Sequence, residues 1–275
     1  MNTKKFVNAD QKTIWDIVFC VSAGVMIGVA LLFAGTCFRN WRIMHYWHHV
    51  AQMKTQTQWS EQNILPQYQS LYEQNPDMVG WLNIEGAKVD YPVMQTKDNP
   101  EYYLWHEFDH QQRGTGTPFV DFRCDVLPER SFNTIIYMHD FMVRGIFDFA
   151  YKNRLYPAHK YIRFDTLEQE GLYELAAVFY VNVADARLMT VWDKDNPQAY
   201  EFYNYIEVDS VNGFEKYLSG ILERRLYETS ARIAPDSHII TLIACADETF
   251  SGMEAPSRIV IIAVQVDTAQ AEAPA

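Results

Sequence analysis

One uncharged segment near the N-terminus limits what this chain can fold into. From Ile17 to Phe38 no residue is charged, and the 22 positions are rich in Val, Ala, Leu, Ile and Phe. A helix needs about 20 apolar residues to cross a bilayer. A signal-peptide core is shorter, and Ala34-Gly-Thr-Cys offers no convincing cleavage site. The segment therefore predicts a permanent transmembrane helix, in preference to a cleaved signal or a buried helix of a soluble protein.

The residues that flank this span predict its orientation. Lys4, Lys5 and Lys12 precede the span, whereas Arg39 and Arg42 follow it. This small basic bias favours a cytoplasmic N-terminus and an extracytoplasmic body. We predict localisation in the cell membrane, with a single pass.

Changes in composition along the chain predict its further divisions. A polar segment rich in Gln, from Trp41 to about Asn75, is expected to be helical, with a break at Pro66. Gly24 and Gly28 have a spacing that can support helix pairing in a membrane, which leaves the oligomeric state open. The predicted parts are a cytoplasmic tail at 1–12, a transmembrane helix at 13–38, a stalk with N-terminal helices at 39–75, the main domain at 76–266 and a disordered tail at 267–275.

The charge of the body excludes some classes of partner. Residues 1–40 carry a net charge of +2, so the remainder of the chain carries −14. An acidic body binds nucleic acid or an anionic lipid surface poorly. The hydrophobic content of 48% indicates a folded core in place of a disordered chain. We therefore predict a globular domain with no nucleic-acid partner.

Cysteine and histidine are too sparse to predict a disulfide scaffold or a metal site. Cys20 and Cys37 lie in the span, which leaves Cys124 and Cys245 outside it. A disulfide-stapled secreted domain uses more cysteines, although a bond between these two is left open. The three histidines between positions 45 and 49 lie in a polar helical segment and are expected to be solvated. No metal and no organic cofactor is predicted.

Beyond Met78 the sequence is dominated by short runs that are typical of β-strands. About eight such runs alternate with turn signals, and only two helices are expected among them, at about 147–156 and 211–227. This proportion predicts a mainly β domain, a barrel that is largely antiparallel or mixed, in preference to a doubly wound sheet.

Three of the predicted strands carry a reactive or charged residue at one end. His139 ends one strand, Cys245 ends another, and Arg258 opens the last. If the last two strands are neighbours, Cys245 and Arg258 lie at the same end of the sheet. A cysteine and a histidine can supply a nucleophile and a general acid–base, and an arginine can stabilise an oxyanion. The alternative is a small buried cysteine with a surface arginine.

The order of these residues resembles the sortase family. Thr241-Leu-Ile-Ala-Cys245 resembles the T-L-x-x-C strand of sortases, and Arg258 opens the strand that follows. The upstream stretches resemble class B sortases in particular, and the helix at about 211–227 fits that class. These stretches are Asn75-Pro-Asp-Met-Val-Gly-Trp-Leu-Asn-Ile, Val89-Asp-Tyr-Pro-Val-Met-Gln, Asp98-Asn-Pro-Glu-Tyr-Tyr-Leu and Gly116-Thr-Pro-Phe-Val-Asp.

The resemblance implies a fold, a reaction and partners. The fold is an eight-stranded sortase-like β-barrel with peripheral helices, and the activity is cysteine transpeptidation. Cys245 attacks a C-terminal sorting motif of surface proteins, His139 acts as general acid and base, and Arg258 holds the substrate carbonyl or oxyanion. The resulting thioester is resolved by an amino group of a peptidoglycan precursor in a Gram-positive bacterium.

Three residues depart from the family pattern. Met138 and Asp140 flank the histidine where the family usually has Gly and often Asn, and Ala244 replaces a usual Thr before the cysteine. Loss of the threonine hydroxyl is expected to remove a hydrogen bond beside the nucleophile, at a cost of about 1 kcal/mol. Asp140 or Asp247 is a candidate for orienting His139.

These departures motivate a second hypothesis of another class, a binding or scaffold protein with a degenerate site. A pilin-polymerising sortase is a variant of the first hypothesis, with a pilin lysine as acceptor. A papain-like hydrolase is disfavoured because its cysteine lies at a helix N-terminus, whereas Cys245 ends a predicted strand.

Overall fold

The fold was described from a computed structural model of the chain. The structure describes residues 4–54, 63–85, 89–113, 116–127, 129–138, 160–182, 202–246 and 257–267, of which 4–14, 182, 245–246 and 257 are described by their backbone. The helix predicted at about 147–156 lies outside these residues. The chain forms two compact units, Met1–Val50 and Ala51–Ala275, each considered by itself.

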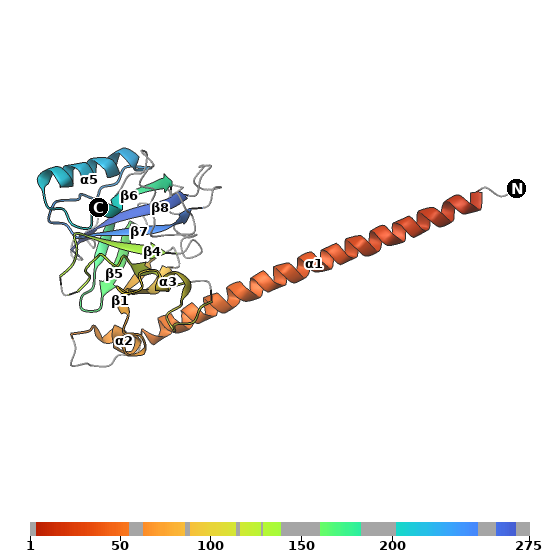
Figure 1. Cartoon of the computed structure of the whole chain (residues 1–275), viewed down its shortest axis with the longest axis horizontal. Coiled ribbons are helices and arrows are strands. Elements are labelled where there is room, and N and C mark those ends of the chain that lie inside the picture. The colour runs from red at the N-terminus through yellow and green to blue at the C-terminus, as the bar shows by residue number, and fades with distance from the viewer. Residues whose placement is uncertain are drawn as a thin grey trace. The chain divides into compact units, whose positions relative to one another are not determined.

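The first unit is occupied by a single long helix. Helix α1 (Lys4–Met53) is continuous for 50 residues, so the predicted span and the start of the predicted stalk belong to one element (Figure 1). Its most apolar window has a mean hydropathy of 2.6, and none of that window is buried. By length and composition this helix can cross a membrane. Helical structure begins again at Pro66 with η1 (Pro66–Tyr68) and α2 (Gln69–Gln74), so the proline at which a break was predicted is the first residue of a helical segment.

The second unit is a closed eight-stranded barrel, which confirms the predicted fold class. Its strands follow the order β1-β2-β3-β4-β7-β8-β6-β5 around the barrel (Figure 1). Their bounds are Met78–Ile84 (β1), Val89–Met94 (β2), Phe119–Val120 (β3), Asn133–Met138 (β4), Tyr161–Thr166 (β5), Leu172–Asn182 (β6), Ile239–Ala246 (β7) and Ser257–Val266 (β8).

The barrel is mixed in strand direction, and its parallel part matters most for the site. Strand β4 pairs in parallel with β7, whereas β7 pairs in antiparallel with β8 and β8 with β6. Because β4 and β7 are parallel, their C-terminal ends lie at the same edge of the sheet. The runs of buried aliphatic residues in these strands are typical of strands covered on both faces.

Short helices cover parts of the barrel wall. Helix α3 (Tyr102–Trp105) and η2 (Phe202–Asn204) are brief, whereas α5 (Val211–Arg224) has 14 residues and packs on β6. Helix α5 begins where the Ser210 hydroxyl accepts a hydrogen bond from the amide of Gly213 at 3.1 Å. It buries Phe214, Tyr217 and Ile221, so the helix predicted at about 211–227 is present and ends three residues early.

Candidate functional site

The structure places the predicted cysteine and arginine on adjacent strands. In the antiparallel ladder between β7 and β8, Cys245 lies directly opposite Arg258. Directly opposite residues of such a ladder belong to the same face of the sheet and lie about 5 Å apart at the backbone. The prediction that both residues lie at one end of the sheet is therefore confirmed.

Arg258 is buried, which excludes the alternative of a surface arginine. Only 1% of its surface is exposed, and it lies between Val181 of β6 and Cys245 of β7. A guanidinium stays protonated at any ordinary pH. Burial lowers the effective dielectric around this fixed positive charge, so the charge acts strongly on nearby groups. It favours a thiolate or an oxyanion at the same end of the two strands.

His139 lies outside the residues that the structure describes. It directly follows Met138, the last residue of β4, and Met138 is paired with Ala244. In the sequence, the residues that follow this register pair are His139 and Cys245. Among the described residues, no group of three or more His, Cys, Asp or Glu is arranged to hold a metal ion.

Two of the departures from the family pattern are neighbours in the structure. Met138 and Ala244 are register partners in the β4–β7 ladder, and both are buried, with 1% and 2% exposed. Successive positions in a strand belong to opposite faces of the sheet. Position 244 therefore falls on the opposite face of the sheet from position 245, and the loss of a hydroxyl beside the nucleophile stays a prediction. In a close-packed interior, a large side chain such as that of Met138 can occupy the space that a small one such as that of Ala244 leaves beside it.

This pairing predicts a coupling between the two positions. Ala244→Thr alone is expected to overpack the ladder and lower the free energy of unfolding by about 1–3 kcal/mol. Met138→Ala alone is expected to leave a cavity and to cost about 2–4 kcal/mol. The double variant is expected to lose clearly less than the sum, as measured by denaturant unfolding. Additive losses would show that the two side chains do not share a space.

A buried polar cluster links β4 and β7 nearer their N-terminal ends. The Thr241 hydroxyl donates a hydrogen bond of 2.7 Å to the side-chain oxygen of Asn133, and both residues are fully buried. Burial raises the pKa of Tyr217 of α5, and the nearby Thr241 side chain partly opposes this rise. The bond between Asn133 and Thr241 ties together the two strands that precede His139 and Cys245 in the sequence. Sequence periodicity could not reveal it, because polar residues within a strand carry no pairing signal.

The buried carboxylate of Asp121 supports the C-terminal end of β4. Asp121 accepts hydrogen bonds from the Arg123 guanidinium at 2.8 and 2.9 Å and from the Tyr137 hydroxyl at 2.9 Å. Burial opposes ionisation of Asp121, but the bonds from Arg123 outweigh it and lower the pKa of the carboxyl. Tyr137 lies two positions before His139, so this cluster stabilises the strand end that precedes the predicted base.

The lowered pKa of Asp121 predicts a pH-dependent contribution to stability. A carboxyl whose pKa is lower in the folded state stabilises the fold above its ordinary pKa of about 4 and loses this effect as the pH falls below it. Asp121→Asn is expected to cost about 2 kcal/mol at pH 7, and less at pH 3. Thermal unfolding at both pH values measures the difference. Asp125→Asn is the control, because Asp125 pairs with Lys97 at an exposed site and is expected to change stability by less than about 0.5 kcal/mol.

Cys124 is a free thiol, so the disulfide that the sequence left open is not formed. It is completely buried, and its sulfur donates to the carbonyl of Asn133 and accepts from the amide of Ile135, both at 3.4 Å. Burial raises the pKa of Cys124 to about 12. A thiol of this kind is a structural residue and a poor nucleophile.

The raised pKa predicts that Cys124 resists alkylation in the folded protein. At pH 8 its thiolate fraction is expected to be more than about a thousandfold below that of an ordinary exposed thiol. Iodoacetamide labelling followed by peptide mass mapping checks this in the Cys20→Ala/Cys37→Ala background. Urea-unfolded protein supplies the control, in which Cys124 should label at an ordinary rate. Equal rates in folded and unfolded protein would contradict the assignment.

Comparison with known proteins identifies relatives of this chain. The chain is 30% identical over 208 residues to Sortase B of Staphylococcus aureus, which covers 74% of this chain and 76% of the relative. It is 30% identical over 191 residues to Sortase B of Listeria monocytogenes, with 67% and 69% covered. No family model matches the chain.

Solved structures that are similar to this fold have the same name. A Staphylococcus aureus sortase B–substrate complex matches with a TM-score of 0.65 and 23% identity, covering 84% of this chain and 99% of that one. Sortase B from Bacillus anthracis in complex with AAEK1 matches with a TM-score of 0.66 and 21% identity, covering 84% and 99%. The sequence identity of 30% over three quarters of a relative, together with the shared fold, shows that the chain belongs to the class B sortases.

Proposed function

We propose that the chain is a membrane-anchored cysteine transpeptidase that transfers surface proteins to an amino group of a cell-wall precursor. The observation that carries the proposal is the pairing of Cys245 with the buried Arg258. Strand β4, the parallel neighbour of β7, ends at Met138, and His139 is the next residue in the sequence. Family membership supports the transpeptidase class, and these three residues supply the groups that such a reaction requires.

The first half of the reaction forms a thioester. The Cys245 thiolate adds to the backbone carbonyl carbon of the residue before the scissile bond, and the carbonyl oxygen becomes an oxyanion. The Arg258 guanidinium stabilises this negative charge. The C–N bond then breaks, and protonated His139 gives its proton to the departing amine.

The second half of the reaction forms the new amide bond. The acceptor amine adds to the thioester carbonyl, and neutral His139 removes the excess proton from the amine. The C–S bond breaks, and the Cys245 thiolate is regenerated. His139 ends protonated, as it began, so the cycle needs no external acid, metal or organic cofactor.

Two related structures support this choice of substrate and acceptor. One neighbour is a sortase B–substrate complex, and another is a sortase B complexed with triglycine. A glycine peptide carries a free amino group, which is the chemical class of acceptor proposed here. The apolar helix α1 supports membrane attachment, and the three lysines before the span favour a cytoplasmic N-terminus and an extracytoplasmic barrel.

The test is a transfer reaction with the full chain in detergent micelles. The donor is a panel of fluorescent peptides with candidate sorting motifs, and the acceptors are triglycine, a diamino acid and a lysine-containing pilin peptide. Mass spectrometry is expected to show a donor–acceptor amide and, without acceptor, slow hydrolysis. A preference for the pilin lysine would favour pilin polymerisation. Failure of every donor and acceptor pair, with no trapped thioester, would favour the scaffold hypothesis.

A further inference from the structure

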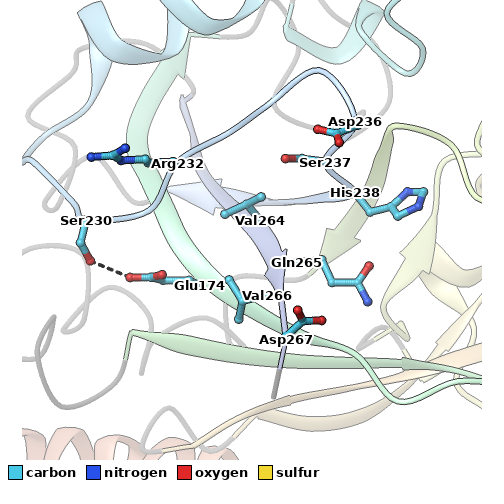
Figure 2. A pocket seen from close by; sticks show the side chains of 10 residues that line it. All are labelled: Glu174, Ser230, Arg232, Asp236, Ser237, His238, Val264, Gln265, Val266 and Asp267. Atoms are coloured by element: carbon cyan, nitrogen blue, oxygen red, sulfur yellow. Dashed lines mark hydrogen bonds between the residues drawn. The ribbon is translucent and has the colours of Figure 1, made fainter. Parts of the chain in front are cut away.

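A polar pocket lies beside the N-terminal end of β7. It has a volume of about 660 Å³ and is formed by the end of β8, the start of β6 and the segment before β7 (Figure 2). His238 lines this pocket and lies seven positions before Cys245 in the sequence. At about 3.3 Å per residue in a strand, the pocket is roughly 20 Å from the site proposed above.

The backbone around the pocket is held by hydrogen bonds. The Gln265 amide donates to the carbonyl of His238 at 2.9 Å, which links the end of β8 to the start of β7. Two hydrogen bonds close the turn before His238. The Ser237 amide donates to the Ala234 carbonyl at 3.0 Å, and the Ala234 amide donates to the Ser237 hydroxyl at 2.9 Å. The charged side chains of the rim therefore project from a fixed frame.

One acidic side chain of the pocket is already engaged. Glu174 of β6 accepts a hydrogen bond of 2.6 Å from the Ser230 hydroxyl, the dashed line in Figure 2, and lies 3.5 Å from the Lys160 ammonium. Its side chain is only 15% exposed. These contacts hold Glu174 in the wall of the pocket, where it serves as a structural group.

Four other charged or ionisable side chains of the pocket are available to a ligand. Arg232, Asp236, His238 and Asp267 are exposed, and within the described residues their side chains make no hydrogen bond or ion pair. Figure 2 shows Arg232 on one side of the pocket, Asp236 and His238 on the other side, and Asp267 below them, just after the end of β8. The pocket thus offers a cation and two exposed acids at separate places.

The lining of the pocket restricts the class of ligand. None of its lining residues is Phe, Tyr or Trp, so a sugar ring or a base would find only the His238 imidazole to stack on. The lining carboxylates oppose a polyanion, whereas Arg232 suits a carboxylate through its fork of donors. Asp236 and Asp267 suit an ammonium group. These features favour a short peptide that carries both a free ammonium and a free carboxylate.

We propose that this pocket binds a peptide of the cell wall and thereby holds the enzyme on its acceptor. The assignment rests on the proposed function, in which a cell-wall peptide supplies the attacking amine at the Cys245 end of the barrel. The pocket and the proposed site lie roughly 20 Å apart, so a wall peptide held in the pocket leaves the site open to an acceptor amine. The pocket increases the local concentration of acceptor by this second attachment.

The experiment uses the full chain in detergent micelles and the tripeptide Lys-D-Ala-D-Ala as probe. Ligand-observed NMR is expected to give a dissociation constant of about 1 mM or lower. Amidation of the carboxylate, or acetylation of both amines, is expected to weaken binding at least about tenfold. Arg232→Gln should weaken binding of the parent peptide but not binding of its amide. Asp267→Asn should weaken binding of the parent peptide but not binding of its acetylated form.

Controls separate this pocket from general charge effects and from the catalytic proposal. Arg225→Gln is the matched variant, because Arg225 lies in the same segment but pairs with Glu228 at 2.9 Å outside the pocket. It should leave binding unchanged. Arg232→Gln should lower retention of the chain on isolated peptidoglycan, whereas Arg225→Gln should not.

Several results would overturn the inference. These are a lack of tripeptide binding at millimolar concentration, binding that does not depend on Arg232 or Asp267, and binding of the tripeptide without retention on peptidoglycan. Preference for a neutral glycan fragment over the peptide would also contradict it. A chain that binds the peptide at this pocket but transfers nothing would support the pocket and contradict the catalytic proposal.

Discussion

Replacing Cys245 by alanine is expected to abolish transfer of a sorting peptide to an amine, with a loss of at least about a thousandfold. The reason is chemical, because alanine cannot form the thioester that both halves of the proposed reaction share. The rate is measured with the full chain, donor peptide and triglycine. Thermal unfolding should change little, since a cysteine at a strand end contributes little to the core.

The control for this variant is the other cysteine of the barrel. Cys124→Ala removes a buried thiol whose raised pKa makes it unreactive, so transfer should continue at near the parental rate. Some loss of stability is expected, because a small cavity remains in a fully buried position. Transfer that persists in Cys245→Ala, or that disappears in Cys124→Ala with the fold intact, would overturn the assignment of the nucleophile.

Replacing Arg258 by lysine is expected to reduce kcat about a hundredfold with a smaller change in KM. Removal of one group that stabilises an oxyanion commonly costs two to three orders of magnitude. Lysine retains a positive charge but not the planar fork of donors. Steady-state kinetics with the sorting peptide measure the effect.

A second substitution at this position distinguishes a catalytic from a structural role. Arg258→Met replaces a buried charge by an apolar chain of similar length, and such changes are often neutral or stabilising for the fold. A loss of activity with unchanged or higher thermal stability would support the proposed role. Parental activity in the methionine variant would show that the positive charge has no part in the reaction.

Much of the fold followed from local sequence patterns. The runs that end at Cys245 and begin at Arg258 were predicted to be strands because both are rich in β-branched and aliphatic residues, and their pairing was left as a condition. The ladder shows that the two strands are neighbours and places the two residues opposite each other. The long apolar helix was predicted from length and composition alone, and α1 contains it.

Other features depend on pairing between distant strands and could not be predicted. Arg258 follows a polar stretch of the sequence, and its burial depends on β6 and β7, which lie on either side of it. Met138 and Ala244 were treated as two independent departures from the family. The parallel register of β4 and β7 shows that they are partners in one ladder. The catalytic role of His139 stays a prediction, since that residue lies outside the described part of the chain.

The parallel pairing of β4 with β7 has a consequence for how the protein matures. Asn133 and Thr241 are hydrogen-bonded although 108 positions separate them in the sequence. Contacts of such long range form slowly, because a large loop must close before they stabilise the chain. Strand β4 therefore has no β7 partner until the C-terminal strands have been synthesised and, in the proposed topology, exported. A chain interrupted before β7 is expected to hold an unpaired strand edge and no assembled thiol site, which confines activity to completed molecules.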